Sequence, residues 1–526
     1  MSERISGTRD YPPWSFPPPV GYWSVSVAIL LGLCWPLGFA PFGFTPLPIL
    51  LLAALFALTS RHGPKAAFWH AYLFGLAGFA TGLYWISHTL HTYGFLPWPL
   101  AIVLMLLLAA VMAFYPAIAV GLARLIFPNR TLAFLVGMPL LWVLLDWLRG
   151  HLFTGFPWLS LGYSQTLAPL GGLAPWVGVY GIGLVAAWMA GLLAWSWAEE
   201  TRRALWLIGF PAVLVIMGLA QLMGQAELTR PVDGPLKVRL LQGNIPQAVK
   251  WSPEAVEPTL RTYVNLLLQT PPGTDLVVLP ESAIPLFRDE VPELLRGLAL
   301  WSQRQGTAII LGIDERVPRG NGVGYYNSAL AITGQGPIQS YRKRHLVPFG
   351  EYVPLRPWIG AVVNQLVPGQ GDFSKGTSVG VLRLDGQSTG TSICYEAAFG
   401  DEIRSDVRAG ARFLLNISND DWFGDTIAPH QHLQMAQMRA RESQRPLARA
   451  TNTGITVFIG PDGRIQSRLP QFQTGALNGT LQPRTGLTPY ARFGDWPVLL
   501  LAGFGLLSAW TWQWRQQRLA PAPEFS

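Results

Sequence analysis

Three polar segments in the second half of this 526-residue chain each carry a residue that could take part in acyl chemistry. LPESAIP contains Glu281, YRKRHLVPFGEYVP contains Lys343 and Glu351, and TSICYEAAFG contains Cys394. Glu281 precedes Lys343 by 62 residues, and Lys343 precedes Cys394 by 51. A carboxylate, an amine and a thiol in separate segments can form one site only if the fold brings the segments together.

These three residue types suit covalent catalysis. Cysteine is the strongest side-chain nucleophile near neutral pH, provided that a base removes its proton. A buried carboxylate can be that base, because desolvation raises carboxyl pKa values. An ammonium group nearby can stabilise both the thiolate and a tetrahedral oxyanion. The set Glu281, Lys343 and Cys394 therefore predicts acyl transfer, while the spacing leaves open whether the three meet.

Each residue also has an ordinary structural interpretation. A lone cysteine such as Cys394 is most often a small buried hydrophobe. Glu281 alone would be an acid at a helix N-terminus, and Lys343 alone would be a solvated member of a basic run. Three histidines lack a zinc-ligand pattern, which favours structural or loop roles and predicts no metal: His345, His430 and His432.

Strands and helices that could position these residues alternate after residue 225. Active sites in α/β domains gather at strand ends. Glu281 follows an apolar run of strand length, and Cys394 follows an apparent strand. We therefore predict an α/β domain over residues 225–495. The expected strands are Val238–Leu241, Leu276–Leu279, Ala308–Ile313, Ser328–Ile332, Phe413–Ile417 and Ile455–Ile459, and the expected helices are Pro258–Gln269, Glu293–Gln305 and Gln431–Arg441.

The rest of the chain has the composition of a membrane protein. Half of all residues are hydrophobic and 13% are charged, against about 25% charged in soluble domains. A membrane-spanning helix needs roughly 20 apolar residues. We predict seven spans within residues 1–224 and an eighth within 496–526. They lie near Trp23–Phe39, Pro46–Thr59, Ala66–Leu90, Trp98–Leu122, Leu132–Trp147, Trp176–Trp197, Leu205–Met223 and Trp496–Trp514.

Basic residues predict the orientation of these spans. Lys and Arg are enriched in cytoplasmic loops. With the N-terminus inside, ten basic residues fall in inside segments, and Arg149 alone falls in an outer loop among the first seven spans. Both termini are then cytoplasmic and the α/β domain is extracytoplasmic. Arg4 and Arg9 favour an uncleaved first helix.

Charge and cysteine content exclude other classes. Five of the eight net positive charges lie outside residues 225–495, so the basic balance reflects membrane topology, and no basic stripe indicates nucleic-acid binding. Two cysteines, Cys34 and Cys394, exclude a disulfide scaffold and a cysteine-rich metal cluster. Gly181-Ile182-Gly183 lies inside an apolar span, which favours helix packing over dinucleotide binding.

The three chemical segments, in this order, resemble the nitrilase superfamily, whose members use a Glu–Lys–Cys triad on an αββα sandwich. Together with the spans, the chain resembles the bacterial apolipoprotein N-acyltransferase family over nearly its whole length. The segments that carry the resemblance are QGNIPQ, Lys250–Trp251, LPESAIP, KRHLVPFGEYVP, ICYE, NISNDDWFGD and, in the membrane half, FTGFPWLSLGYSQ.

The resemblance implies a reaction without a cofactor. An acyl chain would pass from a phospholipid, typically phosphatidylethanolamine, to a cysteine as a thioester. It would then pass to the amino group of the N-terminal diacylglyceryl-cysteine of an apolipoprotein, the last step of lipoprotein maturation. The implied location is a bacterial inner membrane, with the catalytic domain on the periplasmic side.

The resemblance also implies roles for particular residues. Glu281 would be the general base, Lys343 the oxyanion stabiliser and Cys394 the nucleophile. Glu351 would be a second essential carboxylate that helps to position the base and the lysine. The supporting positions after the nucleophile are Tyr395 and Glu396, and the aromatic positions near the site or on loops over it are Trp251 and Trp422.

An aromatic loop should link the site to the bilayer. The outer loop Arg149–Pro175 contains Phe153, Phe156, Trp158 and Tyr163, and aromatic residues favour headgroup depth. We expect this loop to lie at the membrane interface and to help form a lateral opening for acyl chains, although membrane anchoring alone would also explain it.

Two other functions remain to be weighed. A membrane-bound nitrilase-type amidase would use water as the second acceptor, but seven spans are more than a tether needs. A transporter with a sensory domain would need ionisable residues at mid-membrane depth, and the predicted spans are nearly free of charge.

Overall fold

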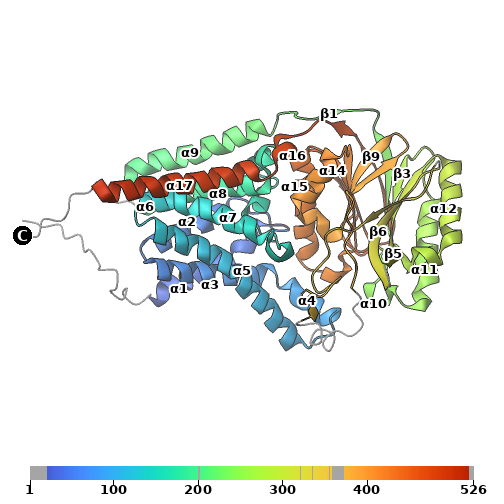
Figure 1. The fold of residues 1–526 in the computed structure, drawn as a ribbon, viewed down its shortest axis with the longest axis horizontal. Helices are drawn as coiled ribbons and strands as arrows, with labels where there is room; N and C mark the ends of the chain where they lie inside the picture. Colours follow the sequence, from blue (N-terminus) through green and yellow to red (C-terminus); the bar gives the residue numbers. More distant parts are fainter. Residues whose placement is uncertain are drawn as a thin grey trace, which may run out of the picture.

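The computed structural model describes residues 21–198, 202–319, 322–334, 336–354, 356–357 and 372–519. The basic flank with Arg4 and Arg9, the proline-rich segment after it and the tail beyond Leu519 lie outside the described residues. A helical half (Figure 1, blue to green) is joined to an α/β domain (yellow to orange), and the last helix returns alongside the helical half. The two parts follow the change in residue pattern at about residue 225.

The helical half consists of long apolar helices. Three segments among the described residues are long and apolar enough to cross a membrane: Trp98–Ile126, Arg130–Arg149 and Pro169–Trp197. The helix over Trp98–Ile126 has 29 residues and is therefore roughly 43 Å long. The helices of this half are α1 (Tyr22–Leu33), α2 (Leu47–Ser60), α3 (Pro64–Gly82), α4 (Trp85–Thr92), α5 (Trp98–Ile126), α6 (Arg130–Leu132), α7 (Met138–Arg149), α8 (Ala174–Ala198), α9 (Arg202–Met223) and α17 (Trp496–Leu519).

The apolar run Ala66–Leu90 is not one continuous helix. The helix α3 ends at Gly82, and α4 begins at Trp85. Polar residues are frequent in α4, and Thr89 donates a hydrogen bond to the backbone carbonyl of Trp422 in the α/β domain, at 2.7 Å. The run was predicted from hydropathy as a single span, but its second part contacts the other half of the chain.

Two sheets form the centre of the α/β domain. Among the described residues, the first sheet has seven strands in the order β14-β2-β3-β5-β6-β7, with β4 beside β5, and the second has six in the order β13-β12-β11-β10-β9-β8. The first contains β14 (Gly475–Leu481), β2 (Leu236–Gln242), β3 (Leu276–Val278), β4 (Ile284–Phe287), β5 (Ala308–Arg319), β6 (Gly322–Ile332) and β7 (Gln339–Arg342). The second contains β13 (Ile465–Arg468), β12 (Val457–Ile459), β11 (Leu447–Thr451), β10 (Phe413–Ser418), β9 (Gln387–Ile393) and β8 (Val381–Leu384).

Helices cover the outer face of each sheet, which gives the predicted αββα sandwich. The outer face of the first sheet packs against α11 (Pro253–Leu268) and α12 (Pro292–Gln305), and that of the second against α14 (Gly400–Arg408) and α15 (Ala428–Ser443). A separate apolar core fills the space between the sheets. Each predicted strand and helix overlaps an observed one, although α11 begins five residues earlier than predicted, at Pro253.

The strands before Glu281 and Cys394 have parallel neighbours, whereas β7, before Lys343, pairs antiparallel with β6. In the first sheet β3 pairs in parallel with β2 and β5, and in the second β10 pairs in parallel with β9 and β11. Parallel strands present their carboxyl ends at one edge of the sheet. The residues that follow β9 and β10 are therefore neighbours within the second sheet, and the hydrogen bond from Asn419 to Glu281 brings the end of β3 to them from the first sheet.

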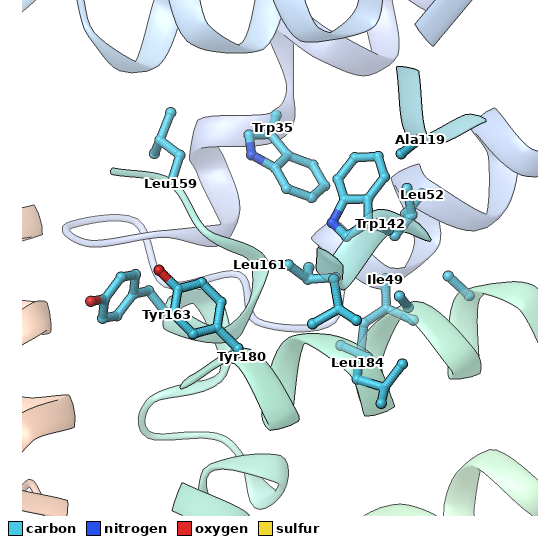
Figure 2. Close-up of a cluster of buried hydrophobic side chains, with 14 of the residues drawn as sticks. Trp35, Ile49, Leu52, Ala119, Trp142, Leu159, Leu161, Tyr163, Tyr180 and Leu184 are labelled. Carbon is cyan, nitrogen blue, oxygen red and sulfur yellow. The ribbon is translucent and has the colours of Figure 1, made fainter. Parts of the chain in front are cut away.

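One apolar cluster continues from the helical half into the α/β domain. Figure 2 shows its helical part, where Trp35 and Trp142 lie side by side and Tyr163 and Tyr180 lie at the edge nearest the pale orange ribbon of the α/β domain. The cluster also includes Met435 and Met438 from α15. The opposite side of α15, with residues such as Ala436, packs on the second sheet. This helix is thus buried between the sheet and the membrane half (Figure 1).

A buried polar contact joins α15 to a break in α8. Gly178 has a φ of +66° inside α8, which interrupts its regular helical conformation. The backbone N–H of Val179 instead donates to Glu442 of α15, at 2.9 Å. Arg439 of α15 donates to the same carboxylate at 3.1 Å and to the Tyr163 hydroxyl at 3.3 Å.

Replacing Gly178 should therefore weaken the junction between the halves. An alanine there would be held at a positive φ, and its Cβ would lie 2.2 Å from the Tyr490 ring. The strain and overlap together should cost about 2 kcal/mol or more. We expect a clearly lower thermal unfolding midpoint of Gly178→Ala in detergent, measured by intrinsic fluorescence.

Gly218 is a matched control in α9, because a Cβ added there has no heavy atom within 4 Å. The variant Gly218→Ala should keep the wild-type midpoint. Equal midpoints for both variants would contradict the role assigned to Gly178.

Candidate active site

Glu281 lies in the loop that follows β3 and is 6% exposed. Its Oε1 accepts a hydrogen bond from Asn327 Nδ2 at 2.7 Å, and its Oε2 accepts one from the backbone N–H of Asn419 at 2.8 Å. Asn327 of β6 and Asn419, just after β10, thus fix the plane of this carboxylate. A carboxylate held in this way has a fixed orientation.

Lys343 follows β7 directly and is 1% exposed. Its Nζ lies 2.8 Å from Glu351 Oε1 and 3.4 Å from Glu281 Oε1. Burial by itself lowers the pKa of Lys343, but the carboxylates of Glu351 and Glu281 raise it above its ordinary value. The amine is therefore a fixed positive charge at neutral pH.

Cys394 follows β9 at the first residue of the short helix η7 (Cys394–Ala398). Its φ is +51°, in the left-handed region that non-glycine residues rarely adopt. Burial first, and then the negative charge of Glu281, raise the pKa of the Cys394 thiol to about 12, against the opposite effect of Lys343. The thiol is thus protonated at neutral pH and needs a base before it can react.

The structure brings Glu281, Lys343 and Cys394 into one buried site. Lys343 contacts Glu281 directly, and both charges act on the thiol. Each residue follows a strand. The strand before Glu281, β3, was among those predicted, whereas β7 and β9 were not. The site contains charges that suit proton removal and oxyanion stabilisation.

Glu351 lies beside the base and shares a donor with it. Asn327 Nδ2 lies 3.0 Å from Glu351 Oε1 as well as 2.7 Å from Glu281 Oε1. The second oxygen of Glu351 accepts the backbone N–H of Val347 at 2.8 Å. Asn327 was missed in the sequence. Its residue type could have identified it, because asparagine is depleted in strands. Asn327 is nevertheless buried inside β6.

Glu396 connects the cysteine segment to the lysine segment. Its Oε2 accepts the backbone N–H of Ile393 at 2.7 Å, just before the nucleophile. Its Oε1 accepts the Tyr341 hydroxyl at 2.7 Å and the backbone N–H of Arg344 at 2.5 Å, just after the lysine. Burial raises the pKa of Glu396 to about 7. This residue thus fixes the relative position of Lys343 and Cys394.

Tyr395 connects the site to the membrane half. Its hydroxyl donates to the backbone carbonyl of Gly155 at 2.9 Å, and its ring stacks on Trp158 at 5.8 Å between ring centroids. The Trp158 indole donates to Gln431 of α15 at 3.0 Å. The loop predicted to lie at the membrane interface therefore packs, in part, against the catalytic domain.

The aromatic residues of that loop differ in exposure. Trp158 and Tyr163 are each 2% exposed, and Phe153 is 87% exposed. Trp158 and Tyr163 are therefore buried between the halves and do not face lipid, whereas the interfacial position of the loop as a whole stays a prediction. Aromatic side chains suit both a protein core and a lipid interface, so composition alone did not distinguish these positions.

Trp251 and Trp422 lie on loops next to the site rather than against the thiol. Trp251 is half exposed, with its ring 5.9 Å from the Lys250 ammonium. Lys250 is buried, and its Nζ lies 3.3 Å from the backbone carbonyl of Glu281. Trp422 is 37% exposed and its ring meets Tyr93 of the membrane half at 5.0 Å.

A possible metal-binding group occurs elsewhere among the described residues. His151, Asp401 and Asp495 place one ligand atom each within 4.8 Å of one another. Asp401 also pairs with Arg404 at 3.4 Å. These residues lie where α7, α14 and α17 meet and include no member of the Glu–Lys–Cys set.

Both parts of the chain match models of known protein families. The model of the carbon-nitrogen hydrolase family matches residues 237–490, and that of the apolipoprotein N-acyltransferase N-terminal domain matches residues 31–192. In structure, yeast (Saccharomyces cerevisiae) Nit3, a member of branch 10 of the nitrilase superfamily, is 19% identical, with a TM-score of 0.37, and covers 49% of this chain and 93% of its own.

The helical half and the carbon-nitrogen hydrolase domain together define a nitrilase-type enzyme associated with a membrane. An apolipoprotein N-acyltransferase of Nitrosomonas europaea is 40% identical over 93% of this chain and 97% of its own. One of Methylococcus capsulatus is 41% identical over 91% of this chain and 94% of its own. The chain therefore belongs to the apolipoprotein N-acyltransferase family and is an acyltransferase.

The raised pKa of Cys394 predicts an unusual pH dependence of alkylation. Only the thiolate reacts rapidly, so modification by iodoacetamide should accelerate about tenfold per pH unit from pH 7 to pH 10. An ordinary cysteine would level off above about pH 8.5. The measurement is intact mass against time in a Cys34→Ala background.

Cys34→Ala combined with Cys394→Ala supplies the blank for this experiment. A plateau at pH 8 to 9 in the Cys34→Ala protein would show that the site does not hold the thiol in its protonated form.

Proposed function

We propose that this chain transfers an acyl chain from a phospholipid, such as phosphatidylethanolamine, to the N-terminal amino group of a diacylglyceryl-modified apolipoprotein. Two half-reactions share one thioester on Cys394. The observation that carries the proposal is the buried thiol beside Glu281 and Lys343, in a site completed by a loop of the membrane half through Tyr395. The catalytic roles of these residues and of Glu351 are part of the proposal.

In the first half-reaction, Glu281 removes the thiol proton as the sulfur attacks the ester carbonyl of the phospholipid. The C–S bond forms, and the carbonyl π electrons move to oxygen to give a tetrahedral oxyanion. Lys343 stabilises this negative charge. The C–O bond to glycerol then breaks, and the leaving alkoxide takes the proton from Glu281, so that a lyso-phospholipid departs and a thioester remains.

In the second half-reaction, the α-amino group of the acceptor attacks the thioester carbonyl. Glu281 accepts a proton from the attacking nitrogen, and the oxyanion again faces Lys343. The C–S bond breaks, and the thiolate recovers its proton from Glu281. The product is an amide and the enzyme returns to its starting form without a cofactor.

Burial favours an amine over water as the second acceptor. Glu281, Lys343 and Cys394 are each less than 9% exposed, and restricted water access protects a reactive intermediate from hydrolysis. Trp251 and Trp422 are partly exposed and are proposed to contact the lipid substrates.

The proposed placement is a bacterial inner membrane. Residues 1–224 would form seven spans, residues 225–495 the periplasmic catalytic domain, and residues 496–526 the eighth span with its tail. Both termini would then be cytoplasmic. The distribution of basic residues supports this orientation. In the proposed orientation, the site would lie beside lipids of the outer leaflet.

The alternative, an amidase that hydrolyses a small amide, fits the triad but not the rest of the chain. It gives no reason for Tyr395 and Trp158 to join the site to the membrane helices. The similarity to apolipoprotein N-acyltransferases also covers both halves.

Intact mass after incubation with phosphatidylethanolamine tests the mechanism. We expect one acyl adduct that hydroxylamine releases, because hydroxylamine cleaves thioesters. The adduct should persist in Cys34→Ala and be absent in Cys394→Ala. An adduct on Cys34, or no adduct with any phospholipid, would exclude the proposed thioester.

The variant Glu281→Gln distinguishes two effects of Glu281, namely its action as a base and the effect of its charge on the pKa of the Cys394 thiol. The negative charge of Glu281 raises the pKa of Cys394, so removing this charge lowers that pKa and should speed alkylation by iodoacetamide at pH 8. The same variant should form no acyl adduct, because it lacks the proton acceptor. Normal acylation in Glu281→Gln would remove Glu281 from the base role.

A further inference from the structure

Cys394 lies in a strained turn whose conformation must be maintained by contacts with other parts of the structure. Cys394 has a φ of +51°, and such conformations persist at functional sites only where the surrounding structure enforces them. The carbonyl oxygen of Cys394 accepts a hydrogen bond from His432 Nε2 at 3.0 Å. Asn416 Nδ2 lies 3.4 Å from the same oxygen. His432 therefore makes the shorter contact that restrains this peptide.

The partners of His432 define its tautomer. A carbonyl oxygen can only accept, so Nε2 must carry the proton. The other ring nitrogen, Nδ1, lies 3.0 Å from Arg449 Nη2, and a guanidinium can only donate. Nδ1 is therefore unprotonated, and the ring is a neutral imidazole with its Nε2–H directed at the backbone of the nucleophile.

Burial and the neighbouring guanidinium of Arg449 keep the His432 ring neutral. Asp420 Oδ1 lies 3.3 Å from His432 Nδ1, but both oxygens of Asp420 accept from Arg449 Nη2, at 2.8 and 2.9 Å. Burial and the charge of Arg449 lower the pKa of His432, outweighing the opposite effect of Asp420. Two aromatic side chains, Trp158 and Phe423, also lie against the ring.

The position of His432 also links the turn to the two halves of the molecule. It lies on α15, is fully buried, and packs against Trp158 of the membrane half, with 6.0 Å between ring centroids. Asp420 is fixed further by Ser418, which donates to it at 2.9 Å. The Nε2–H is thus directed by contacts from β10, β11 and the membrane loop together.

We infer that His432 is a positioning residue for the reaction: its Nε2–H holds the Cys394 carbonyl and thereby directs the thiol between Glu281 and Lys343. It moves no proton, because its one proton is engaged by a carbonyl and its free nitrogen faces a guanidinium. This differs from a cysteine–histidine pair, in which the imidazole is the base for the thiol. The inference rests on the proposed function, since it assigns Cys394 as the nucleophile.

Two polar substitutions of different length test this role. The amide of His432→Gln can reach the Cys394 carbonyl, whereas that of His432→Asn is too short. Loss of one such hydrogen bond in the transition state should lower kcat of the Asn variant by about tenfold or more, with KM for phosphatidylethanolamine within about twofold of wild type. His432→Gln should recover kcat to within about threefold of wild type.

The dependence of kcat on pH distinguishes positioning from proton transfer. If His432 only positions the nucleophile, the Gln variant keeps the wild-type pH profile between pH 5.5 and pH 9. A profile that loses or shifts an inflection would make His432 an acid or base and overturn the inference. Equal kcat values for the Asn variant and the wild type would overturn it as well.

Thermal midpoints of the same preparations exclude a general loss of structure. His430→Gln on the same helix is the matched control and should behave as wild type. If Cys394→Ala still forms an acyl adduct, the proposed function has failed. If Cys394→Ala is inactive while His432→Asn is fully active, only the role of His432 has failed.

Discussion

The contact of the Lys343 ammonium with two carboxylates, deep in the protein, is the interaction on which the site depends. Charges taken out of water carry a large desolvation penalty, which only close partners offset. Lys343 lies between Glu351 and Glu281, and Asn327 contacts both acids. Burial first, and then the negative charge of Glu281, raise the pKa of the Cys394 thiol, so that the thiol stays protonated until substrate arrives.

The membrane half is a structural part of the site as well as its anchor. Arg149 is buried and donates to the backbone carbonyls of Phe156 and Trp158, at 2.6 and 2.7 Å. It thus shapes the loop whose Trp158 and Gly155 contact Tyr395, the residue after the nucleophile. A nitrilase-type domain without these helices would lose contacts at the residue next to its cysteine.

Sequence patterns predicted the framework of the site better than its details. The α/β domain and the strand end that carries Glu281 followed from short apolar runs and the residues after them. The sandwich of two sheets and the roles of the residues came from the family resemblance. The hydrogen-bond donors Asn327, Asn419 and His432 were not assigned, because strand register and helix packing bring them to the site from distant parts of the chain.

Hydropathy likewise predicted one span over Ala66–Leu90, where the structure has two helices. It also gave no sign that Trp158 and Tyr163 are buried. In both cases the deciding contacts are with the other half of the chain, such as the bond from Thr89 to Trp422. A local window of sequence contains no information on such partners.

The burial of both faces of α15 has a consequence for how substrates meet the thiol. A helix packed on a sheet on one side and on membrane helices on the other has no free surface along which to slide. The catalytic domain is therefore held at one height and one angle above the helices. Under the proposed function, Cys394 therefore stays at one height relative to the bilayer. Both lipid-anchored reactants then reach it by lateral diffusion in two dimensions rather than by motion of the domain.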